Sequence, residues 1–275
     1  MGSHSIVKGE RVTAADALRG RTKLLGSDFD GCIATYGVPY QTDPQVGRLA
    51  DLIRSRRGIE FAVVSGGRLG RLREFADDVN AVLFAENGGV MYVPQGRHGS
   101  GTKVLVDQDK VDLILRTVVP LADGFLSSAF PGYDRHDKLT MVTYEKPAGV
   151  DMDEFRRGFE EFAVSLPLDV RKRIAMTHTD RLIDVVYAGE NKSKAVERML
   201  SLFNYKGPES AYVGDGSNDI PGFRVMDARG GWIVTPANSD RMVKEYVRQS
   251  GSPRIIEHPL ESTDCMMDLV SALRK

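Results

Sequence analysis

The stretch TKLLGSDFDGCIATYG, residues 22–37, decides the fold prediction. An apolar run ends at Ser27, and two aspartates, Asp28 and Asp30, follow before the chain turns at Gly31. Two carboxylates at that spacing repel one another and resist burial, so the pair is costly unless a cation lies between them. A turn or a helix cap explains one aspartate at a strand end, but not a second. The pair therefore raises the question of a cation site, which the rest of the sequence has to answer.

Length and composition are those of an ordinary globular chain. It has 275 residues with 37 Lys and Arg against 38 Asp and Glu, a formal net charge of −1. This balance gives no sign of a nucleic-acid partner or of an anionic membrane surface. Two cysteines are too few for a disulfide framework, no apolar run could span a bilayer, and MGSHSIVKGE lacks the apolar core of a signal peptide. These features together predict a cytoplasmic protein.

Short apolar runs alternate with amphipathic segments, which is the pattern of parallel βαβ units. Such strands are expected at 22–28, 60–65, 81–86 and 210–215. From about residue 88 to residue 188 the strands alternate polar and apolar side chains, which favours a smaller α+β unit. The sequence therefore predicts an α/β fold: a Rossmann-like, doubly wound parallel-sheet core formed by residues 1–87 and 189–275, and an inserted α+β cap domain at 88–188.

Four motifs carry reactive side chains at strand ends or helix starts. They are Asp28 with Asp30, Ser65 of VVSGGR, Lys192, and Asp215 with Asp219 of VGDGSND. Ligands of an open parallel sheet bind at the carboxyl ends of its strands, so all four motifs are expected to converge there. All-oxygen ligation selects a hard cation, above all Mg²⁺ when a phosphate completes the shell. Each motif alone is weak evidence, and their order and placement carry the prediction.

In this combination the motifs resemble those of the haloacid dehalogenase-like phosphatases. AENGG, residues 85–89, is similar to the subgroup with a large α/β cap, the Cof-type phosphatases, near which sugar-phosphate phosphatases belong. The resemblance implies a Rossmann-like core, a cap domain and bound Mg²⁺. It also implies hydrolysis of a small phosphorylated metabolite, such as a sugar phosphate or a glycosyl-phosphoglycerate, through an aspartyl-phosphate.

The resemblance also implies residue roles. Asp28 is the expected nucleophile, Asp30 the general acid and base, and Lys192 the cation that neutralises Asp28. The expected metal ligands are Asp28, Asp30 through its main-chain carbonyl, Asp215 and Asp219. The expected phosphate- or substrate-binding residues are Ser65, Gly66, Arg68, Asn87, Arg135, Lys138, His178 and Asn218, with His136 as a further candidate. Specificity is expected from the cap.

Several alternatives stay open from the sequence. Lys194 competes with Lys192 for the lysine role. Cys32 stands where the family usually has threonine, either as a reactive thiol or as a small semi-buried residue. A phosphotransferase or phosphomutase of the same fold would pass the phosphoryl group to a sugar instead of water. A signalling phosphoacceptor module and a non-catalytic binding protein are the alternatives from other classes.

Overall fold

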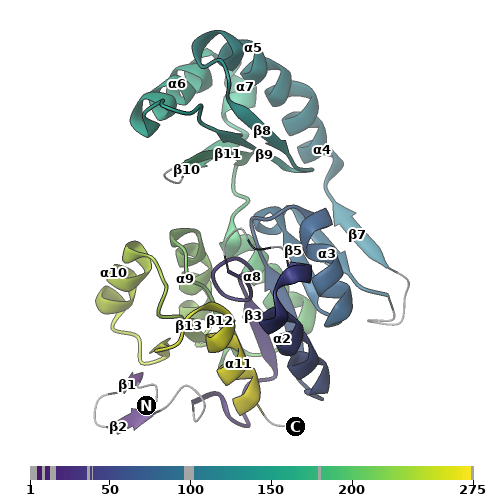
Figure 1. The fold of residues 1–275 in the computed structure, drawn as a ribbon, viewed down its shortest axis with the longest axis vertical. Coiled ribbons are helices and arrows are strands. Elements are labelled where there is room, and N and C mark those ends of the chain that lie inside the picture. Colours follow the sequence, from purple (N-terminus) through teal and green to yellow (C-terminus); the bar gives the residue numbers. More distant parts are fainter. Residues whose placement is uncertain are drawn as a thin grey trace. The chain divides into compact units, whose positions relative to one another are not determined.

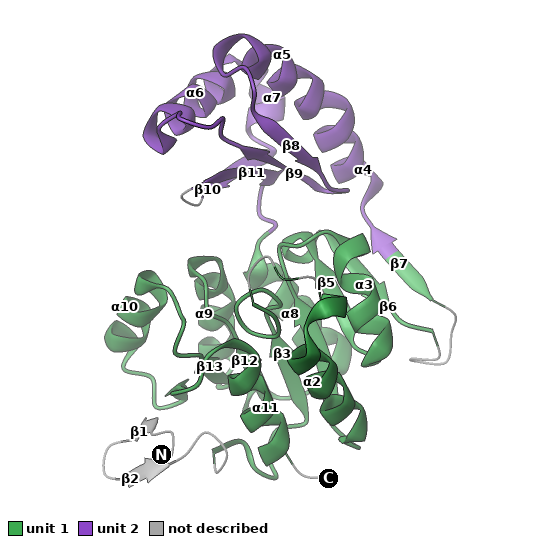
Figure 2. Ribbon diagram, in the orientation of Figure 1, with its two compact units in different colours: residues 1–104, 191–275 green, residues 105–190 purple. Residues whose placement is uncertain are grey.

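The computed structural model describes the backbone of residues 5–7 and 10–12, and residues 17–35, 38, 40–95, 102–178 and 181–273 with their side chains. Its elements are shown in Figure 1. The chain forms two compact units, unit 1 from residues 1–104 and 191–275 and unit 2 from residues 105–190 (Figure 2). None of the helices in the described part of the chain is both long and apolar enough to cross a membrane.

Unit 1 is built on an eight-stranded sheet with the order β14-β13-β12-β3-β4-β5-β6-β7. The strands are β3 (Leu24–Ser27), β4 (Glu60–Val64), β5 (Val82–Ala85), β6 (Val90–Val93), β7 (Lys103–Val106), β12 (Ser210–Val213), β13 (Trp232–Thr235) and β14 (Ile255–Glu257). Neighbours from β14 to β5 are parallel, and β6 is antiparallel to β5. The predicted doubly wound α/β core is therefore confirmed.

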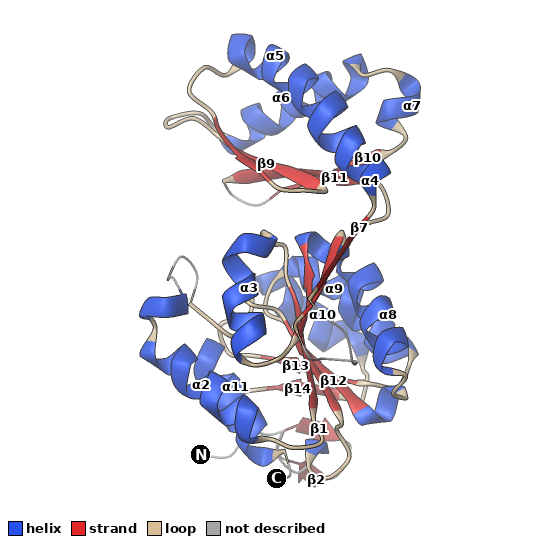
Figure 3. Cartoon of the chain, turned by 90° about the vertical axis from the view of Figure 1, so that its right-hand side faces the viewer, coloured by secondary structure: helices blue, strands red, loops and turns tan. Residues whose placement is uncertain are grey.

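Helices cover both faces of this sheet (Figure 3). One face carries α2 (Pro44–Ser55), α3 (Leu69–Asp78) and α11 (Ser262–Ala272), and the other carries α8 (Lys192–Phe203), α9 (Ile220–Ala228) and α10 (Arg241–Ser250). Because both faces are covered, the central strands are mostly apolar, as in VLFA of β5, which is fully buried. Asp43 caps α2 by accepting hydrogen bonds from the Gln45 and Val46 amides, and Pro44 follows in the first turn, as the sequence predicts.

Unit 2 has a four-stranded antiparallel sheet with the order β10-β11-β9-β8. The strands are β8 (Asp134–Asp137), β9 (Met141–Glu145), β10 (Ile174–His178) and β11 (Leu182–Tyr187). Its helical segments are α4 (Gln108–Val111), a π-helical stretch (Asp112–Val118), α5 (Val119–Ala129), α6 (Met152–Ser165) and α7 (Leu168–Arg171). Figure 3 shows α5 and α6 on one face of the sheet. Phe155, Phe159 and Phe162 of α6 belong to one buried cluster with Tyr144 and Val185 of the sheet.

Unit 2 begins at residue 105, not at residue 88 as the sequence predicted. The difference arises because Val90–Val93 turns back after β5 and pairs with it as an antiparallel strand, with Phe84 opposite Met91. Strand β7 then extends the same sheet. The polar and apolar alternation that suggested a new unit at residue 88 therefore reflects the change from parallel to antiparallel strands within unit 1.

Candidate active site

Asp28 lies directly after β3 and is buried, with 4% of its surface exposed. Its amide donates to Val213 of the adjacent strand β12 (2.9 Å), which fixes the backbone where β3 ends. Its Oδ1 accepts from the Phe29 amide (2.7 Å), and its Oδ2 lies 2.5 Å from Lys192 Nζ. The carboxylate is therefore held by one donor on each oxygen, and each oxygen keeps a lone pair for a further partner.

Asp215 follows β12 and lies against the turn after Asp30. A Cβ on Gly31 would lie 2.0 Å from Asp215 Oδ2, and Gly31 has φ +77°, so glycine is required at this position on both counts. Asp215 is 3% exposed, and its Oδ1 accepts a hydrogen bond from Cys32 Sγ (3.4 Å). The turn sequence DGC thus brings the Asp215 carboxylate beside the end of β3.

Three buried carboxylates and one ammonium group meet at this end of the sheet. Asp28, Asp215 and Asp219 each offer an oxygen within 4.8 Å of the others, and Lys192 Nζ lies 2.8 Å from Asp219 Oδ1. Burial disfavours the Lys192 ammonium, but the charges of Asp219 and Asp28 outweigh burial and raise its pKa. The cluster therefore joins three acidic side chains and one basic side chain. Burial and then the charges of Asp219 and Asp215 accordingly raise the pKa of Asp28, with Lys192 opposing them.

Asp30 has a partner that the sequence analysis missed. Both oxygens of its carboxylate accept hydrogen bonds from the guanidinium of Arg71, one of them at 2.9 Å. Arg71 belongs to the first turn of α3, and its guanidinium also lies 5.7 Å from the ring centre of Phe29. Arg71 belongs to no motif of the sequence, and its contact with Asp30 depends on how α3 packs. The sequence instead predicts a role for Arg68 of the same segment.

Ser65, Gly66 and Asn87 come together after β4 and β5. Ser65 is 1% exposed, and its Oγ accepts from the Gly67 amide (3.0 Å). The Asn87 amide donates to the Ser65 carbonyl (2.9 Å), and a Cβ on Gly66 would lie 3.3 Å from Asn87 Oδ1. Asn87 Oδ1 is buried and has no hydrogen-bond partner among the described residues. Glu86 and Asn87 both have positive φ, 54° and 57°, a strained backbone of the kind found at ligand sites.

The other predicted residues of unit 1 lie at its surface. Arg68, at the cap position of α3, and Asn218, in the turn after β12, are exposed. The alternative lysine, Lys194, pairs with Glu197 at 3.0 Å, and both side chains are about half exposed. Lys192, by contrast, is 1% exposed. Only Lys192 of the two lysines therefore contacts the aspartate cluster.

The predicted residues of unit 2 are divided between the two faces of its sheet. Arg135 is opposite Tyr144, on the face that packs against the helices, and its guanidinium pairs with Asp123 of α5. His178, opposite Ile183, lies on the same face. Lys138 instead lies 3.9 Å from Asp184 Oδ1. Asp184 is opposite Thr143, which in turn is opposite His136, so these three residues share the face opposite the helices.

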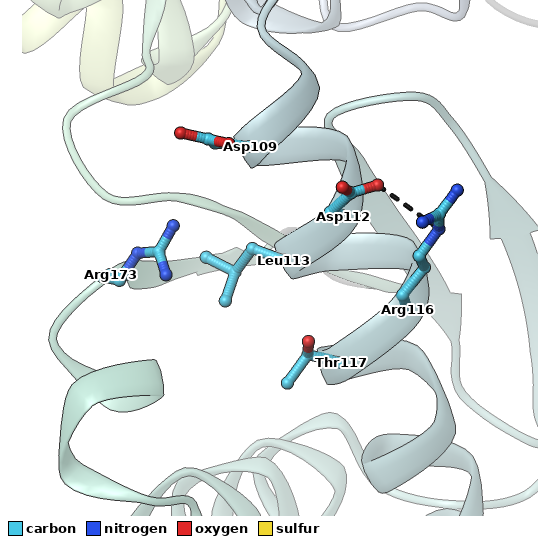
Figure 4. Close-up of a pocket in the computed structure, with 6 residues that line it drawn as sticks. All are labelled: Asp109, Asp112, Leu113, Arg116, Thr117 and Arg173. Atoms are coloured by element: carbon cyan, nitrogen blue, oxygen red, sulfur yellow. Dashed lines mark ion pairs between the residues drawn. The ribbon is translucent and has the colours of Figure 1, made fainter.

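A further hollow on unit 2, of about 490 Å³, is lined by side chains of both charges (Figure 4). Asp112 pairs with Arg116 across one turn of the helical segment at 3.3 Å, and Asp109 and Arg173 complete the charged lining. Two carboxylates and two guanidinium groups line the hollow, so its charges balance. It therefore lacks the excess of buried carboxylates that distinguishes the aspartate cluster.

Cys32 is fully buried, and so is Cys265, the only other cysteine. Burial, followed by the nearby charge of Asp215, raises the pKa of the Cys32 thiol well above its ordinary value, and burial raises that of Cys265. A raised pKa removes the thiolate, which is the reactive form. The structure therefore supports the small buried residue over the reactive thiol.

We expect neither thiol to react quickly with a thiol-specific reagent in the native protein near pH 8. In denaturant both should react at the rate of a free cysteine, which serves as the control for reagent and protein. One thiol reacting within seconds in the native protein would contradict the buried, protonated state of Cys32.

Comparisons with known proteins identify solved structures with a similar fold. No protein-family model matches the sequence, and no curated protein matches it either. Among solved structures, the sucrose-phosphatase of Synechocystis sp. PCC6803 is similar at TM-score 0.63 and 17% identity, over 91% of this chain and 97% of that one. The C-terminal domain of the C. albicans trehalose-6-phosphate phosphatase gives TM-score 0.66 and 16% identity, over 92% of both chains.

A haloacid dehalogenase-like hydrolase from Bacteroides thetaiotaomicron is also similar, at TM-score 0.60 and 15% identity, over 82% of this chain and 91% of that one. At sequence identities this low, the comparisons show similarity of fold alone. The resemblance stated from the motifs is thus confirmed at that level: the chain has the fold of the haloacid dehalogenase-like hydrolases.

Proposed function

We propose that the protein is a Mg²⁺-dependent phosphatase that hydrolyses a small phosphorylated metabolite through an aspartyl-phosphate on Asp28. One observation carries the proposal: three carboxylates and Lys192 are buried together where β3 and β12 end. Burying that much charge of one sign is costly, and a fold under selection for stability alone would replace it. A parallel sheet offers its ligand site at this end of the strands.

The proposed reaction has two steps. A carboxylate oxygen of Asp28 bonds to phosphorus while the bond to the ester oxygen breaks, and Asp30 gives that oxygen its proton. Water then bonds to phosphorus, Asp30 takes a proton from it, and the bond between phosphorus and Asp28 breaks. Inorganic phosphate leaves, and both carboxyl groups return to their starting states. Both oxygens of Asp30 accept hydrogen bonds from Arg71, so Asp30 acts as the acid only after it leaves this contact and takes up a proton.

The residues present fit a magnesium ion. Asp28 and Asp215 supply carboxylate oxygens, the donor type that Mg²⁺ prefers, and the main-chain carbonyl of Asp30 is the predicted third ligand. A divalent cation would offset the excess of carboxylates over ammonium groups at the cluster. When bound, Mg²⁺ would withdraw charge from the phosphoryl group.

We propose that Lys192, Ser65 and the backbone at Gly66 bind the phosphoryl oxygens of the substrate. The Ser65 hydroxyl accepts one amide hydrogen bond and so can still donate its own hydrogen to a phosphoryl oxygen. The unpaired buried oxygen of Asn87 suits a hydroxyl of the substrate, since an acceptor left without a partner is unfavourable. Arg68 and Asn218 remain candidates at the rim, and Arg135, His136, Lys138 and His178 remain candidates on unit 2.

The substrate class that we propose is a sugar phosphate. The support is the similarity in fold to a sucrose-phosphatase and to trehalose-6-phosphate phosphatases. Both cysteines are free, which suits the cytoplasmic location that we propose.

The experiment that tests the proposal is a screen of the purified protein against phosphorylated sugars and glycosyl-phosphoglycerates with Mg²⁺, in which released inorganic phosphate is measured. We expect release without any added acceptor. Release that requires a second sugar would indicate a phosphotransferase or mutase. No release from any compound, including p-nitrophenyl phosphate, would contradict the proposal.

Asp30→Asn is expected to separate the two steps. Asparagine cannot donate or accept the proton, so turnover of a sugar phosphate should fall by about 10²- to 10⁴-fold. With p-nitrophenyl phosphate, whose leaving group needs no proton, the first step should persist and phosphoenzyme should accumulate. The measurement is a rapid-quench comparison of the two substrates. Equal losses on both would show that Asp30 is not the proton donor.

A further inference from the structure

Tyr212 lies on β12 with its side chain fully buried, and its hydroxyl points at the aspartate cluster. The hydroxyl donates to Asp219 Oδ1 at 2.6 Å. Two glycines border the ring: a Cβ on Gly26 of β3 or on Gly222 of α9 would lie 3.2 Å from ring carbons of Tyr212. The ring also meets Phe223 edge to face, with ring centres 5.9 Å apart. Close packing on these sides leaves the hydroxyl one position.

Asp219 is fully buried, and each of its oxygens has two donors. Oδ1 accepts from Tyr212 and from Lys192 Nζ (2.8 Å), while Oδ2 accepts from the amides of Asp215 (3.2 Å) and Gly216 (3.0 Å). An ionised carboxylate has about four acceptor positions. All four are therefore occupied by this chain's own donors, and Asp219 could bind a metal ion directly only by releasing one of them.

Asp219 Oδ1 thus accepts hydrogen bonds from both Tyr212 and Lys192. Lys192 Nζ lies between Asp219 and Asp28, so the strength of one contact affects the other. A second donor on Oδ1 draws negative charge from that oxygen and weakens its hold on the ammonium. Without the Tyr212 hydroxyl, Lys192 would be drawn toward Asp219 and away from Asp28.

We propose that Tyr212 is a positioning residue for the reaction: by sharing Asp219 Oδ1 with Lys192, it leaves the ammonium available to Asp28 and to the phosphoryl group. Asp219 then acts on Lys192 and not as a ligand of the metal. This inference rests on the proposed phosphatase function. Tyr212 has no part in the two proposed reaction steps themselves. Asp219, which the sequence predicts as a metal ligand, becomes a partner of Lys192 instead.

The test is Tyr212→Phe, which removes one oxygen and keeps the ring. We expect kcat on p-nitrophenyl phosphate to fall by about 10- to 100-fold, as for other partners one step removed from a reacting group. Magnesium affinity, measured by calorimetry without substrate, should stay within about twofold, because the Mg²⁺ ligands are untouched. The matched control is Tyr246→Phe: Tyr246 also contacts the Phe223 ring, at 5.9 Å, but belongs to α10. It should change neither quantity.

A nuclear magnetic resonance readout keeps the test independent of turnover. The side-chain ammonium signal of Lys192 should shift in Tyr212→Phe and stay in place in Tyr246→Phe. In the parent protein, the Tyr212 hydroxyl proton should give a slowly exchanging signal, which needs no variant at all. A parent without phosphatase activity would defeat the proposed function, whereas these signals report on the hydrogen bonds alone.

Three results would overturn the inference. The first is an unchanged kcat in Tyr212→Phe. The second is a magnesium affinity that rises in this variant, since a freed lone pair on Asp219 would then be binding the metal. The third is a nuclear magnetic resonance result of either kind. The Lys192 signal does not move in Tyr212→Phe, or the Tyr212 hydroxyl proton of the parent exchanges with solvent as fast as a free hydroxyl proton does.

Discussion

Asp28→Asn is expected to abolish turnover while making the metal-free protein more stable. An amide cannot attack phosphorus, and loss of a nucleophile that works with neighbouring groups typically costs 10⁴-fold or more in kcat. Burial and the neighbouring carboxylates raise the pKa of Asp28, so the folded protein holds this proton more tightly than the unfolded chain does. Keeping Asp28 ionised at neutral pH therefore lowers the free energy of unfolding, and asparagine removes that cost.

The measurements are phosphate release and thermal unfolding in EDTA. Each kcal/mol of relief should raise the unfolding midpoint by roughly 2–4 °C in a chain of this size. The matched control is Asp51→Asn on α2, whose carboxylate is exposed and pairs with Arg54. It should leave activity and midpoint unchanged. An active Asp28→Asn, or one much less stable than the parent, would contradict the role of Asp28.

Removal of magnesium is expected to stop phosphate release completely. Without a cation, three carboxylates face one ammonium, and the phosphoryl group of a substrate would add negative charge to that surplus. Excess EDTA should therefore reduce the rate to background, and added Mg²⁺ should restore it. Calcium should fail to replace magnesium, because its larger and looser coordination shell does not hold the reacting groups in line.

Magnesium should also raise the unfolding midpoint of the parent, because a ligand that binds only the folded state stabilises it. Asp215→Asn tests the assignment of the site, since it removes one ligand without touching Asp28. In this variant the magnesium-dependent rise should be lost or moved to much higher concentrations. Full activity in excess EDTA, or the same rise in Asp215→Asn, would rule out the proposed metal site.

Much of unit 1 could be predicted because its signals are local. An apolar run that ends in two aspartates and a glycine marks a buried strand followed by a tight turn, and a Cβ on Gly31 would clash with the Asp215 carboxylate. Asp43 and Pro44 mark a helix start in the same way. Lys192 was favoured over Lys194 by its place in a motif, and the structure buries it between Asp28 and Asp219.

What could not be predicted depends on partners distant in the sequence. The strand alternation in β8 shows that Arg135 and His136 face opposite ways, but only the pairing of Arg135 with Tyr144 shows which face meets the helices. Neither Arg71 nor Tyr212 belongs to one of the sequence motifs that predicted the site. Their contacts with Asp30 and Asp219 follow from how α3 and β12 pack, which no local pattern specifies.

The most direct test of the account is mass spectrometry of Asp30→Asn after brief reaction with p-nitrophenyl phosphate and Mg²⁺, quenched in acid. The account predicts that the peptide with residues 22–37 gains the mass of one phosphoryl group, located on Asp28. The gain should disappear in EDTA and in the double variant with Asp28→Asn. Phosphate release from an active protein with no modified Asp28, or with the phosphoryl group on another residue, would contradict the aspartyl-phosphate mechanism.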